Sequence, residues 1–184
     1  MRVIAGKFKG RHIKAVPGNL TRPTTDKVKE ATFQIMGPFF DKGSCLDLYA
    51  GSGSLGIEAL SRGMEYAIFV DKQTKAIHTI HENIMELKLE SETEVYRTDA
   101  FRALQAAAKR ELQFDLILLD PPYKKASYGD LLDEIAKLGL AKQNGYIYCE
   151  HDQRETLPEN HSKFKLIKQA SYGGTIGISL YQKL

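Results

Sequence analysis

The chain has 184 residues, of which 42% are hydrophobic and 27% are charged, and its formal net charge at pH 7 is +3. This length fits a single domain over residues 1–184, and the composition excludes the disordered and membrane-embedded classes. The sequence shows neither a signal-peptide core nor an apolar run of about 18 residues, so we expect a cytoplasmic protein without a membrane partner.

Positive charge gathers at the N-terminus. Residues 1–29 contain eight Lys or Arg and one acidic residue, which gives this segment a net charge of +7 and leaves −4 for the remaining chain. A basic arm on a mildly acidic body suits a phosphate-binding surface, because each neutralised phosphate releases counterions. A merely solvated surface explains the charge equally well. The candidate nucleic-acid contacts in the arm are Arg2, Lys7, Lys9 and Arg11.

Residues 1–43 are predicted to form this basic arm followed by a helix. Glycines within residues 2–14 are typical of turns in a short hairpin or an extended arm, whose faces are more basic than apolar. Thr24 or Thr25 can cap the helix that follows, because a hydroxyl at this position accepts a hydrogen bond from an unpaired backbone N–H. The Gly-Pro pair at 37–38 marks the end of this helix region.

From residue 44 onward, apolar runs alternate with helical stretches. Strands are expected at 45–48, 67–70, 93–96, 114–119 and 146–149, and helices near 55–63, 73–88, 99–110 and 128–139. Strand-helix repetition argues for a parallel sheet. Two final strands, at 164–167 and 176–181, are joined by a Gly-Gly turn and favour an antiparallel pair at the sheet edge. Cys45 and Cys149 fall in different strands and are expected to be buried, reduced thiols.

Residues 47–56, Asp-Leu-Tyr-Ala-Gly-Ser-Gly-Ser-Leu-Gly, predict a strand that runs through a glycine turn into a helix. Glycines let the backbone approach a ligand, although a purely structural turn uses them too. Asp71 ends the second strand, at a spacing from which an acid reaches ribose hydroxyls. Asp99 follows the third strand, where it either reads an adenine edge or caps a helix. Asp47, Asp71 and Asp99 thus lie at the carboxyl ends of successive predicted strands, which is where open α/β sheets bind ligands.

Two nucleoside cofactors fit this pattern, a dinucleotide and S-adenosylmethionine. Asp47 would face a pyrophosphate unfavourably, but it would attract the α-ammonium group of a sulfonium cofactor. Gly56 preserves the glycine spacing of a dinucleotide site, so the pattern leaves both cofactors open.

The tetrapeptide Asp120-Pro121-Pro122-Tyr123 follows the most apolar of the predicted strands. Two consecutive prolines lack backbone donors, so the carbonyls and the carboxylate remain as acceptors. Asp120 and the Pro121 carbonyl suit the two N–H donors of a base amino group, and Tyr123 offers a face for stacking the base. Asp120 could also accept the proton when the nitrogen becomes cationic. A rigid loop after a strand is the alternative.

Two other groups of residues are weaker candidates. His78 and His81, with Glu82, lie on one predicted helix without a third ligand, so we expect solvated side chains and no metal site. Glu150 and His151 follow the fifth strand and either line the cleft or close the strand.

The motifs and their order along the chain resemble those of the bacterial RsmD-type methyltransferases, which methylate N2 of a guanine in small-subunit ribosomal RNA. The resemblance covers nearly the whole chain, and its more family-specific parts are the N-terminal Arg-Val-Ile-Ala-Gly and Arg-Pro-Thr segments. The matching motifs are Arg22-Pro-Thr-Thr-Asp, the glycine motif, Asp71, Asp99-Ala100, Asp120-Pro-Pro-Tyr and Tyr172-Gly-Gly-Thr.

The resemblance implies a Rossmann-like class I methyltransferase fold, with a seven-stranded, mostly parallel sheet that has one antiparallel strand. Residues 44–184 would form the catalytic core, with S-adenosylmethionine as cofactor and ribosomal RNA or the small ribosomal subunit as partner. Asp120, Pro121, Pro122 and Tyr123 would hold the guanine, and Arg22 and Thr24 would lie near the cofactor and the RNA entrance. The expected cofactor-binding residues are Asp47, Tyr49, Ala50, Gly51, Gly53, Asp71, Lys72, Asp99, Ala100 and Phe101.

Two other functions compete with this one. DNA adenine-N6 methylation uses the same tetrapeptide on a base that must also be unstacked, but the chain leaves no room for a separate DNA-recognition module. A non-enzymatic RNA-binding assembly factor that retains the fold is the third hypothesis.

Overall fold

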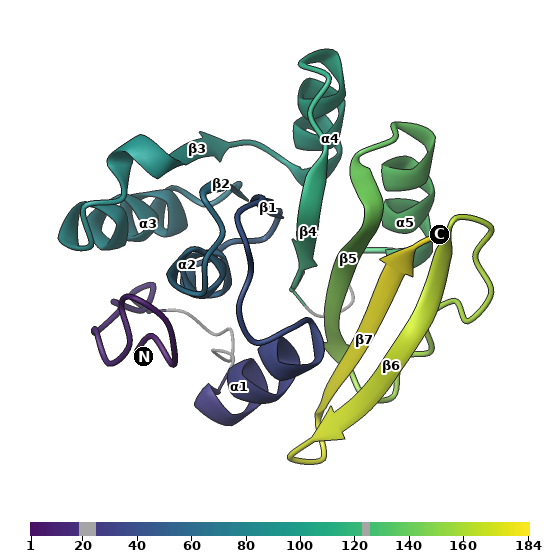
Figure 1. Ribbon diagram of the computed structural model, residues 1–184, viewed down its shortest axis with the longest axis horizontal. Helices are drawn as coiled ribbons and strands as arrows, with labels where there is room; N and C mark the ends of the chain where they lie inside the picture. The colour runs from purple at the N-terminus through teal and green to yellow at the C-terminus, as the bar shows by residue number, and fades with distance from the viewer. Residues whose placement is uncertain (19–24, 123–125) are drawn as a thin grey trace.

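The computed structural model describes residues 1–18, 25–122 and 126–184, which form a 7-stranded sheet with helices on both faces (Figure 1). The strands are β1 (Ser44–Asp47), β2 (Tyr66–Asp71), β3 (Thr93–Arg97), β4 (Phe114–Leu119), β5 (Ala141–Asp152), β6 (Phe164–Tyr172) and β7 (Ile176–Lys183). The helices are α1 (Asp26–Ile35), α2 (Ser54–Ser61), α3 (Thr74–Glu86), α4 (Ala100–Lys109), α5 (Tyr128–Lys137) and the short 3₁₀ helix η1 (Glu90–Glu92).

The sheet has the strand order β3-β2-β1-β4-β5-β7-β6. Strands β1 to β5 pair in parallel, because each crossover helix returns the chain to the same edge of the sheet. β7 is antiparallel to both β5 and β6, so within this sheet it alone opposes the other strands. The expected mostly parallel, seven-stranded sheet with one antiparallel strand is confirmed.

The strand order reverses beside β1. The chain first moves outward from β1 to β2 and β3, and then returns to place β4 on the other side of β1. The connections that leave the carboxyl ends of β1 and β4 therefore diverge, which opens a crevice between them.

Two apolar layers cover the faces of the sheet. Helices α1, α2 and α3 pack on one face through side chains such as Phe33, Leu60 and Ile80, and α4 and α5 pack on the other through Leu104 and Leu132. None of the helices that the structure describes is long and apolar enough to cross a membrane.

Two strands extend beyond their apolar patterns. β5 starts at Ala141 and passes through a polar stretch in which Asn144 has a φ of 63° and the pairing with β4 shifts register. β6 continues past 164–167 to Tyr172, because its backbone pairs with β7. Backbone hydrogen bonding determines where these strands begin and end, and it cannot be predicted from the polarity of the side chains. The predicted burial of Cys45 and Cys149 as free thiols in different strands is confirmed.

The N-terminal segment, residues 1–16, packs against the body of the protein. An antiparallel bridge joins Arg2 to His12. Val3 and Ile13 are 1% and 0% exposed, although the sequence predicts faces that are more basic than apolar. A few apolar side chains therefore anchor the segment, because burying each one removes its surface from water.

Helix α1 follows the N-terminal segment and begins at a threonine cap. The Thr25 hydroxyl accepts a hydrogen bond from the Val28 N–H at 3.3 Å, which satisfies one of the unpaired donors of the first turn. Thr25 is therefore the cap, and the other candidate, Thr24, lies outside the described residues.

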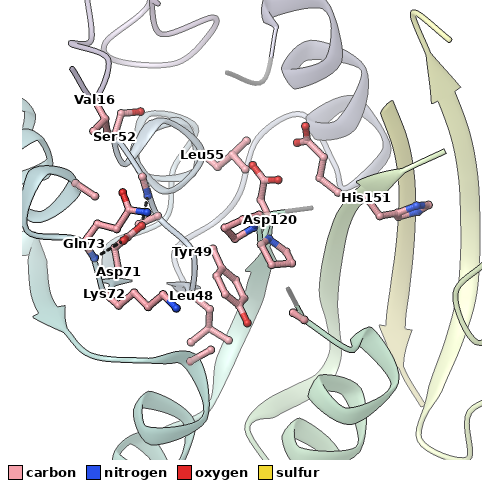
Figure 2. A pocket seen from close by; sticks show the side chains of 18 of the residues that line it. Val16, Leu48, Tyr49, Ser52, Leu55, Asp71, Lys72, Gln73, Asp120 and His151 are labelled. Atoms are coloured by element: carbon pink, nitrogen blue, oxygen red, sulfur yellow. Dashed lines mark hydrogen bonds between the residues drawn. The ribbon is translucent and has the colours of Figure 1, made fainter. Parts of the chain in front are cut away.

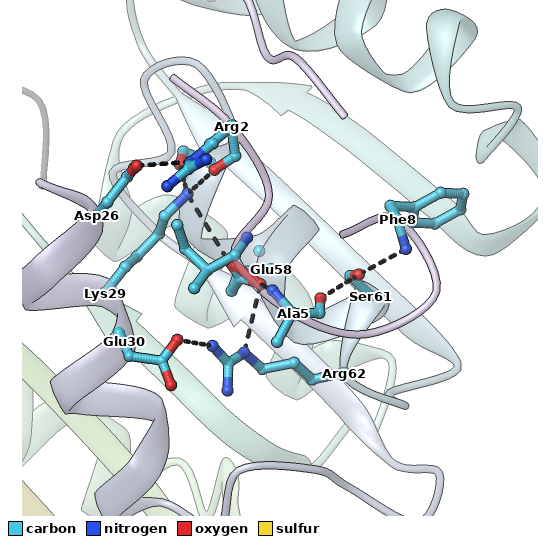
Figure 3. Close-up of polar contacts among 12 residues, drawn as sticks. Arg2, Ala5, Phe8, Asp26, Lys29, Glu30, Glu58, Ser61 and Arg62 are labelled. Atoms are coloured by element: carbon cyan, nitrogen blue, oxygen red, sulfur yellow. Dashed lines mark hydrogen bonds and ion pairs between the residues drawn. The ribbon is translucent and has the colours of Figure 1, made fainter. Parts of the chain in front are cut away.

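A buried ion cluster joins the N-terminal segment to α1 and α2 (Figure 3). One oxygen of Glu58 lies 3.7 Å from the Lys29 ammonium, and the other lies 3.3 Å from Nε of Arg62. The backbone N–H groups of Ile4 and Ala5 donate to the same carboxylate at 2.8 and 3.3 Å. The Glu58 carboxylate thus connects three segments that are distant in the sequence.

Candidate active site

A cavity of about 1160 Å³ opens at the carboxyl edge of the sheet, at the crevice between β1 and β4 (Figure 2). Its walls come from the glycine turn after β1, the ends of β2, β4 and β5, the starts of α4 and α5, and the N-terminal segment. Pockets for one small ligand typically occupy about 300–1,000 Å³. The cavity therefore has room for a nucleoside cofactor together with part of a second ligand.

The glycine turn exposes its backbone to this cavity. Gly51 has a φ of +56°, a conformation that favours glycine, and the space that a Cβ would occupy there is open. The Gly51 N–H donates to Asp71 Oδ2 at 2.9 Å, and the Gln73 N–H donates to Asp71 Oδ1 at 2.9 Å. Asp71 thereby connects the turn to the end of β2, as Figure 2 shows.

The ends of β2 and β3 contribute the adjoining part of the wall. Asp99 caps α4 by accepting a hydrogen bond from the Arg102 N–H at 3.0 Å, and it also lines the cavity. The interpretation of Asp99 as a helix cap is therefore confirmed, and its position on the cavity wall leaves contact with an adenine edge as a prediction. Phe101 is 39% exposed, so its ring presents apolar surface on which a heteroaromatic ring can pack. The other predicted cofactor residues that line the cavity are Tyr49, Ala50, Lys72 and Ala100.

Asp47 lies beneath the glycine turn instead of on the cavity wall, contrary to the expectation that it faces the cofactor. It is 1% exposed, and its Oδ2 accepts a hydrogen bond from the Gly56 N–H at 3.1 Å. Burial raises the pKa of Asp47 to about 7, and the negative charge of Asp71 contributes. Gly53, which precedes α2 with a φ of 85°, likewise does not line the cavity, since a Cβ there would point at the core side chains of Phe69, Ile57 and Ile80. Both residues shape the turn from below.

Replacement of Asp47 by asparagine should stabilise the ligand-free protein at neutral pH. Because the folded-state pKa of Asp47 lies above its unfolded value, this carboxyl reduces stability progressively as pH rises from about 4 to about 7. An asparagine oxygen can still accept from Gly56 but does not titrate. Urea unfolding should show a gain of about 1–3 kcal/mol near pH 8 that disappears near pH 4. A gain that does not vary with pH would contradict this origin.

Asp120 and the two prolines after it form the opposite wall, at the end of β4. Burial raises the pKa of Asp120 well above its ordinary value, and the nearby carboxylates of Glu150 and Asp47 raise it further. A carboxyl group with a raised pKa is a better proton acceptor near neutral pH than an ordinary aspartate.

The basic side chains of the N-terminal segment lie at the surface. Arg2, Lys7 and Arg11 form exposed ion pairs with carboxylates of the body, at 2.9, 3.4 and 3.8 Å, and Lys9 is exposed. Exposed ion pairs of this kind contribute about 0–1 kcal/mol, so exchanging their partners for phosphates costs little. Three predicted site residues lie outside the described part of the chain: Arg22, Thr24 and Tyr123.

The two weaker groups of candidate residues differ in their position relative to the cavity. Glu150 and His151 belong to β5, which continues beyond them, and both line the cavity. His78 and His81 lie exposed on α3. Within residues 1–18, 25–122 and 126–184, no group of three His, Cys, Asp or Glu side chains is placed to hold a metal ion.

Several residues that line the cavity were not predicted from the sequence motifs, because they come from segments that do not follow the end of a predicted strand. Asn83 of α3 joins the N-terminal segment to the glycine turn beside the cavity. Its side chain accepts a hydrogen bond from the Lys14 N–H at 2.9 Å and donates one to the Ser52 carbonyl at 2.9 Å. A polar residue inside a predicted helix gives no hint of this connection. The residues missed in this way include Met1, Ala15, Val16, Ser127 and Asp130.

A family model described as "Conserved hypothetical protein 95" matches residues 1–182. The chain belongs to this family. It is 52% identical over 183 residues to "Putative rRNA methyltransferase YlbH" of Bacillus subtilis (strain 168), with 100% of this chain and 99% of the relative covered. It is 27% identical over 183 residues to "Ribosomal RNA small subunit methyltransferase D" of Escherichia coli (strain K12), with 100% and 90% covered.

Solved structures share the same architecture. "Putative methyltransferase yhhF from Escherichia coli" has a TM-score of 0.84 at 29% identity and covers 100% of this chain and 97% of its own. A conserved hypothetical protein from Streptococcus pyogenes has a TM-score of 0.80 at 35% identity, with 85% and 96% covered. The resemblance to the RsmD-type, S-adenosylmethionine-dependent methyltransferases is confirmed, and the chain is a methyltransferase of this type.

Proposed function

We propose that this enzyme transfers a methyl group from S-adenosylmethionine to the N2 amino group of a guanine in small-subunit ribosomal RNA. The observation that carries the proposal is the shared cavity, in which Asp120 and the prolines after β4 face the same space as the glycine turn after β1. One wall suits a nucleoside cofactor, and the other suits the amino group of a base. The names of the relatives support ribosomal RNA as the polymer, and such a substrate implies action in the cytoplasm.

The glycine-turn wall fits S-adenosylmethionine better than a dinucleotide. Asp71 and Asp120 line the cavity and Asp47 lies directly below it, so the site favours a cationic sulfonium and ammonium over a pyrophosphate. When bound, the cofactor would supply an electrophilic methyl group and leave as a neutral thioether. The residues proposed to hold it are Tyr49, Ala50, Gly51, Asp71, Lys72, Asp99, Ala100 and Phe101, with Asp47 and Gly53 supporting the turn.

The opposite wall would hold the reacting nitrogen. Pro121 and Pro122 lack N–H groups, so the backbone of the two residues after Asp120 offers acceptors only. The Asp120 carboxylate and the Pro121 carbonyl would accept the two amino hydrogens and orient the nitrogen lone pair toward the methyl carbon. As the new N–C bond forms, Asp120 would take the proton that the nitrogen loses. Stacking on Tyr123 remains part of this proposal.

The basic N-terminal segment would bind the RNA backbone beside the cavity. Met1 and Val16 of this segment line the cavity, while Arg2, Lys7 and Lys9 lie on its outer surface. Phosphate contacts position a nucleic acid without reading its sequence. Arg11, Arg22 and Thr24 complete the proposed RNA-binding set.

The decisive test is methyl transfer from labelled S-adenosylmethionine to small ribosomal subunits from a strain that lacks this gene, followed by nucleoside analysis and mapping of the position. Labelled N2-methylguanosine would support the cofactor, the target atom and the polymer together. Unlabelled RNA with measurable cofactor binding would overturn the assignment. Preferential labelling of N6-methyladenine in duplex DNA would favour the DNA alternative.

Replacement of Asp71 by alanine should weaken S-adenosylmethionine binding by about 10–100-fold, because it removes a proposed ribose contact and leaves the N–H groups of Gly51 and Gln73 without their acceptor. Calorimetric titration measures the dissociation constant. Replacement of Glu90, which is exposed on η1, by alanine is the control and should change the constant less than about twofold. Unchanged affinity in the Asp71 variant would remove it from the cofactor site.

A further inference from the structure

The pairing of β4 with β5 places two carboxylates side by side at the edge of the cavity. The parallel register sets Leu118 opposite Tyr148 and Leu119 opposite Cys149. The next positions along the two strands are Asp120 and Glu150, and both line the cavity. Because neighbouring strands lie about 4.8 Å apart, side chains that leave them in the same direction are neighbours.

Both carboxylates point to the same face of the sheet. Leu118 and Tyr148 belong to the apolar layer beneath α1, α2 and α3, and side chains two positions further along a strand share its face. Figure 2 shows the Asp120 side chain on the side of Leu55 of α2, whereas the His151 ring points away from it.

Glu150 is held in place from within the core. Its side chain is buried, and the hydroxyl of Tyr148 donates to its Oε2 at 2.8 Å. The Tyr128 hydroxyl donates to the Glu150 backbone carbonyl. A carboxylate supported in this way is a rigid acceptor at the wall of the cavity, and the proposed methyl-transfer chemistry gives it no task.

We propose that Glu150 determines the choice of base by accepting the N1–H of guanine while Asp120 holds the adjacent N2 amino group. This assignment rests on the proposed function. In guanine, N1–H and the amino group are attached to the same carbon, so the two donors match two adjacent carboxylates. In adenine and cytosine, the ring nitrogen beside the amino group is a bare acceptor. Glu150 would face that lone pair with its own, so the site disfavours both bases.

The analogue 2-aminopurine isolates this contact, because it keeps the reacting amino group and replaces the N1–H by a bare nitrogen. Wild-type enzyme should prefer guanine over 2-aminopurine by about 100-fold or more in kcat/KM. In Glu150→Gln, the amide oxygen can still accept from Tyr148 and the NH₂ can donate to the bare N1. The preference should therefore fall by about tenfold or more. Loss of the other guanine contacts affects both proteins equally and cancels in the comparison.

The same substitution should shift the pH dependence of kcat/KM. Among the described residues, the titratable groups that interact electrostatically with Asp120 are Glu150 and Tyr148 of β5, Asp47 of β1 and Tyr128 of α5. Glu150 raises the pKa of Asp120, so neutralising Glu150 lowers it and moves the acid limb of the profile to lower pH. A residue that only supported the fold would not move this limb.

The experiment uses small subunits reconstituted with ribosomal RNA that carries either guanine or 2-aminopurine at the mapped position. Wild type, Glu150→Gln, Glu150→Asp and the control Glu155→Gln are compared, because Glu155 is exposed and does not line the cavity. Cofactor affinity and thermal unfolding verify that each variant is folded. Glu150→Asp keeps the charge and should retain the preference for guanine, as should Glu155→Gln.

A reduced preference for guanine in Glu150→Gln alone, together with the shifted acid limb, would support the assignment. Equal use of both bases by the wild type, or an unchanged preference in Glu150→Gln, would overturn it while leaving guanine methylation intact. Failure of the wild type to methylate guanine at all would overturn the proposed function and this assignment with it.

Discussion

Replacement of Asp120 by alanine is expected to lower kcat by about 10²–10⁴-fold, because the variant loses both the acceptor that orients the amino group and the group that takes its proton. The dissociation constant for S-adenosylmethionine should change less than about threefold, since the glycine turn and Asp71 on the opposite wall stay intact. Single-turnover methyl transfer with saturating cofactor measures the first quantity, and calorimetric titration measures the second.

Asp120→Asn is the matched variant. Asparagine keeps one oxygen acceptor at the same position but does not ionise in this pH range. It should retain more activity than the alanine variant and lose the acid limb that the raised pKa of Asp120 produces. Full activity in Asp120→Ala, or an acid limb that persists in Asp120→Asn, would contradict the role assigned to this carboxylate.

Replacement of Glu58 by alanine is expected to lower the free energy of unfolding by about 3–5 kcal/mol. Lys29, Glu58 and Arg62 are 1%, 0% and 2% exposed, so removing the carboxylate deprives Lys29 of its ion pair with Glu58 and leaves the buried Arg62 paired with Glu30. Ile4 and Ala5 also lose the acceptor of their backbone N–H groups. Denaturation in urea, with an unchanged slope, measures the loss.

An exposed ion pair supplies the control for this measurement. Glu86 lies 3.8 Å from Arg11, and its side chain is 71% exposed, so Glu86→Ala should cost less than about 1 kcal/mol. Equal losses in the two variants would show that the buried cluster contributes no more than a surface pair. Because the cluster holds the N-terminal segment, the Glu58 variant should also become more sensitive to proteolysis before residue 16.

The order of strands and helices was readable from local patterns. Each apolar run between helical stretches became a strand of the parallel sheet, and the glycine pair at 173–174 became the turn before β7. Where the patterns failed, at the start of β5 and the end of β6, the residues are polar and the strand persists through backbone hydrogen bonds. Propensity and periodicity describe side chains, so they cannot detect this kind of pairing.

Only part of the site could be predicted from local sequence patterns. Gly51, Asp71, Asp99 and Asp120 each follow a predicted strand, and all four line one cavity because parallel strands end at one edge. Asp47 shows the limit of the approach, since its place in the motif suggested a ligand contact and its side chain instead supports the turn. Which direction a side chain takes at a strand end depends on packing above and below the sheet.

The sequence by itself determined the fold class, the glycine turn and the tetrapeptide after β4, because these depend on local periodicity and on residues with restricted backbone geometry. Tertiary structure alone decided that the basic N-terminal segment forms part of the cavity wall, where hydrogen bonds to Asn83 and Glu58 hold it. It also decided that Glu150 lies beside Asp120. Both depend on contacts between residues far apart in the chain. Such contacts arise from sheet order, register and the burial of charged groups, and a linear pattern does not encode them locally.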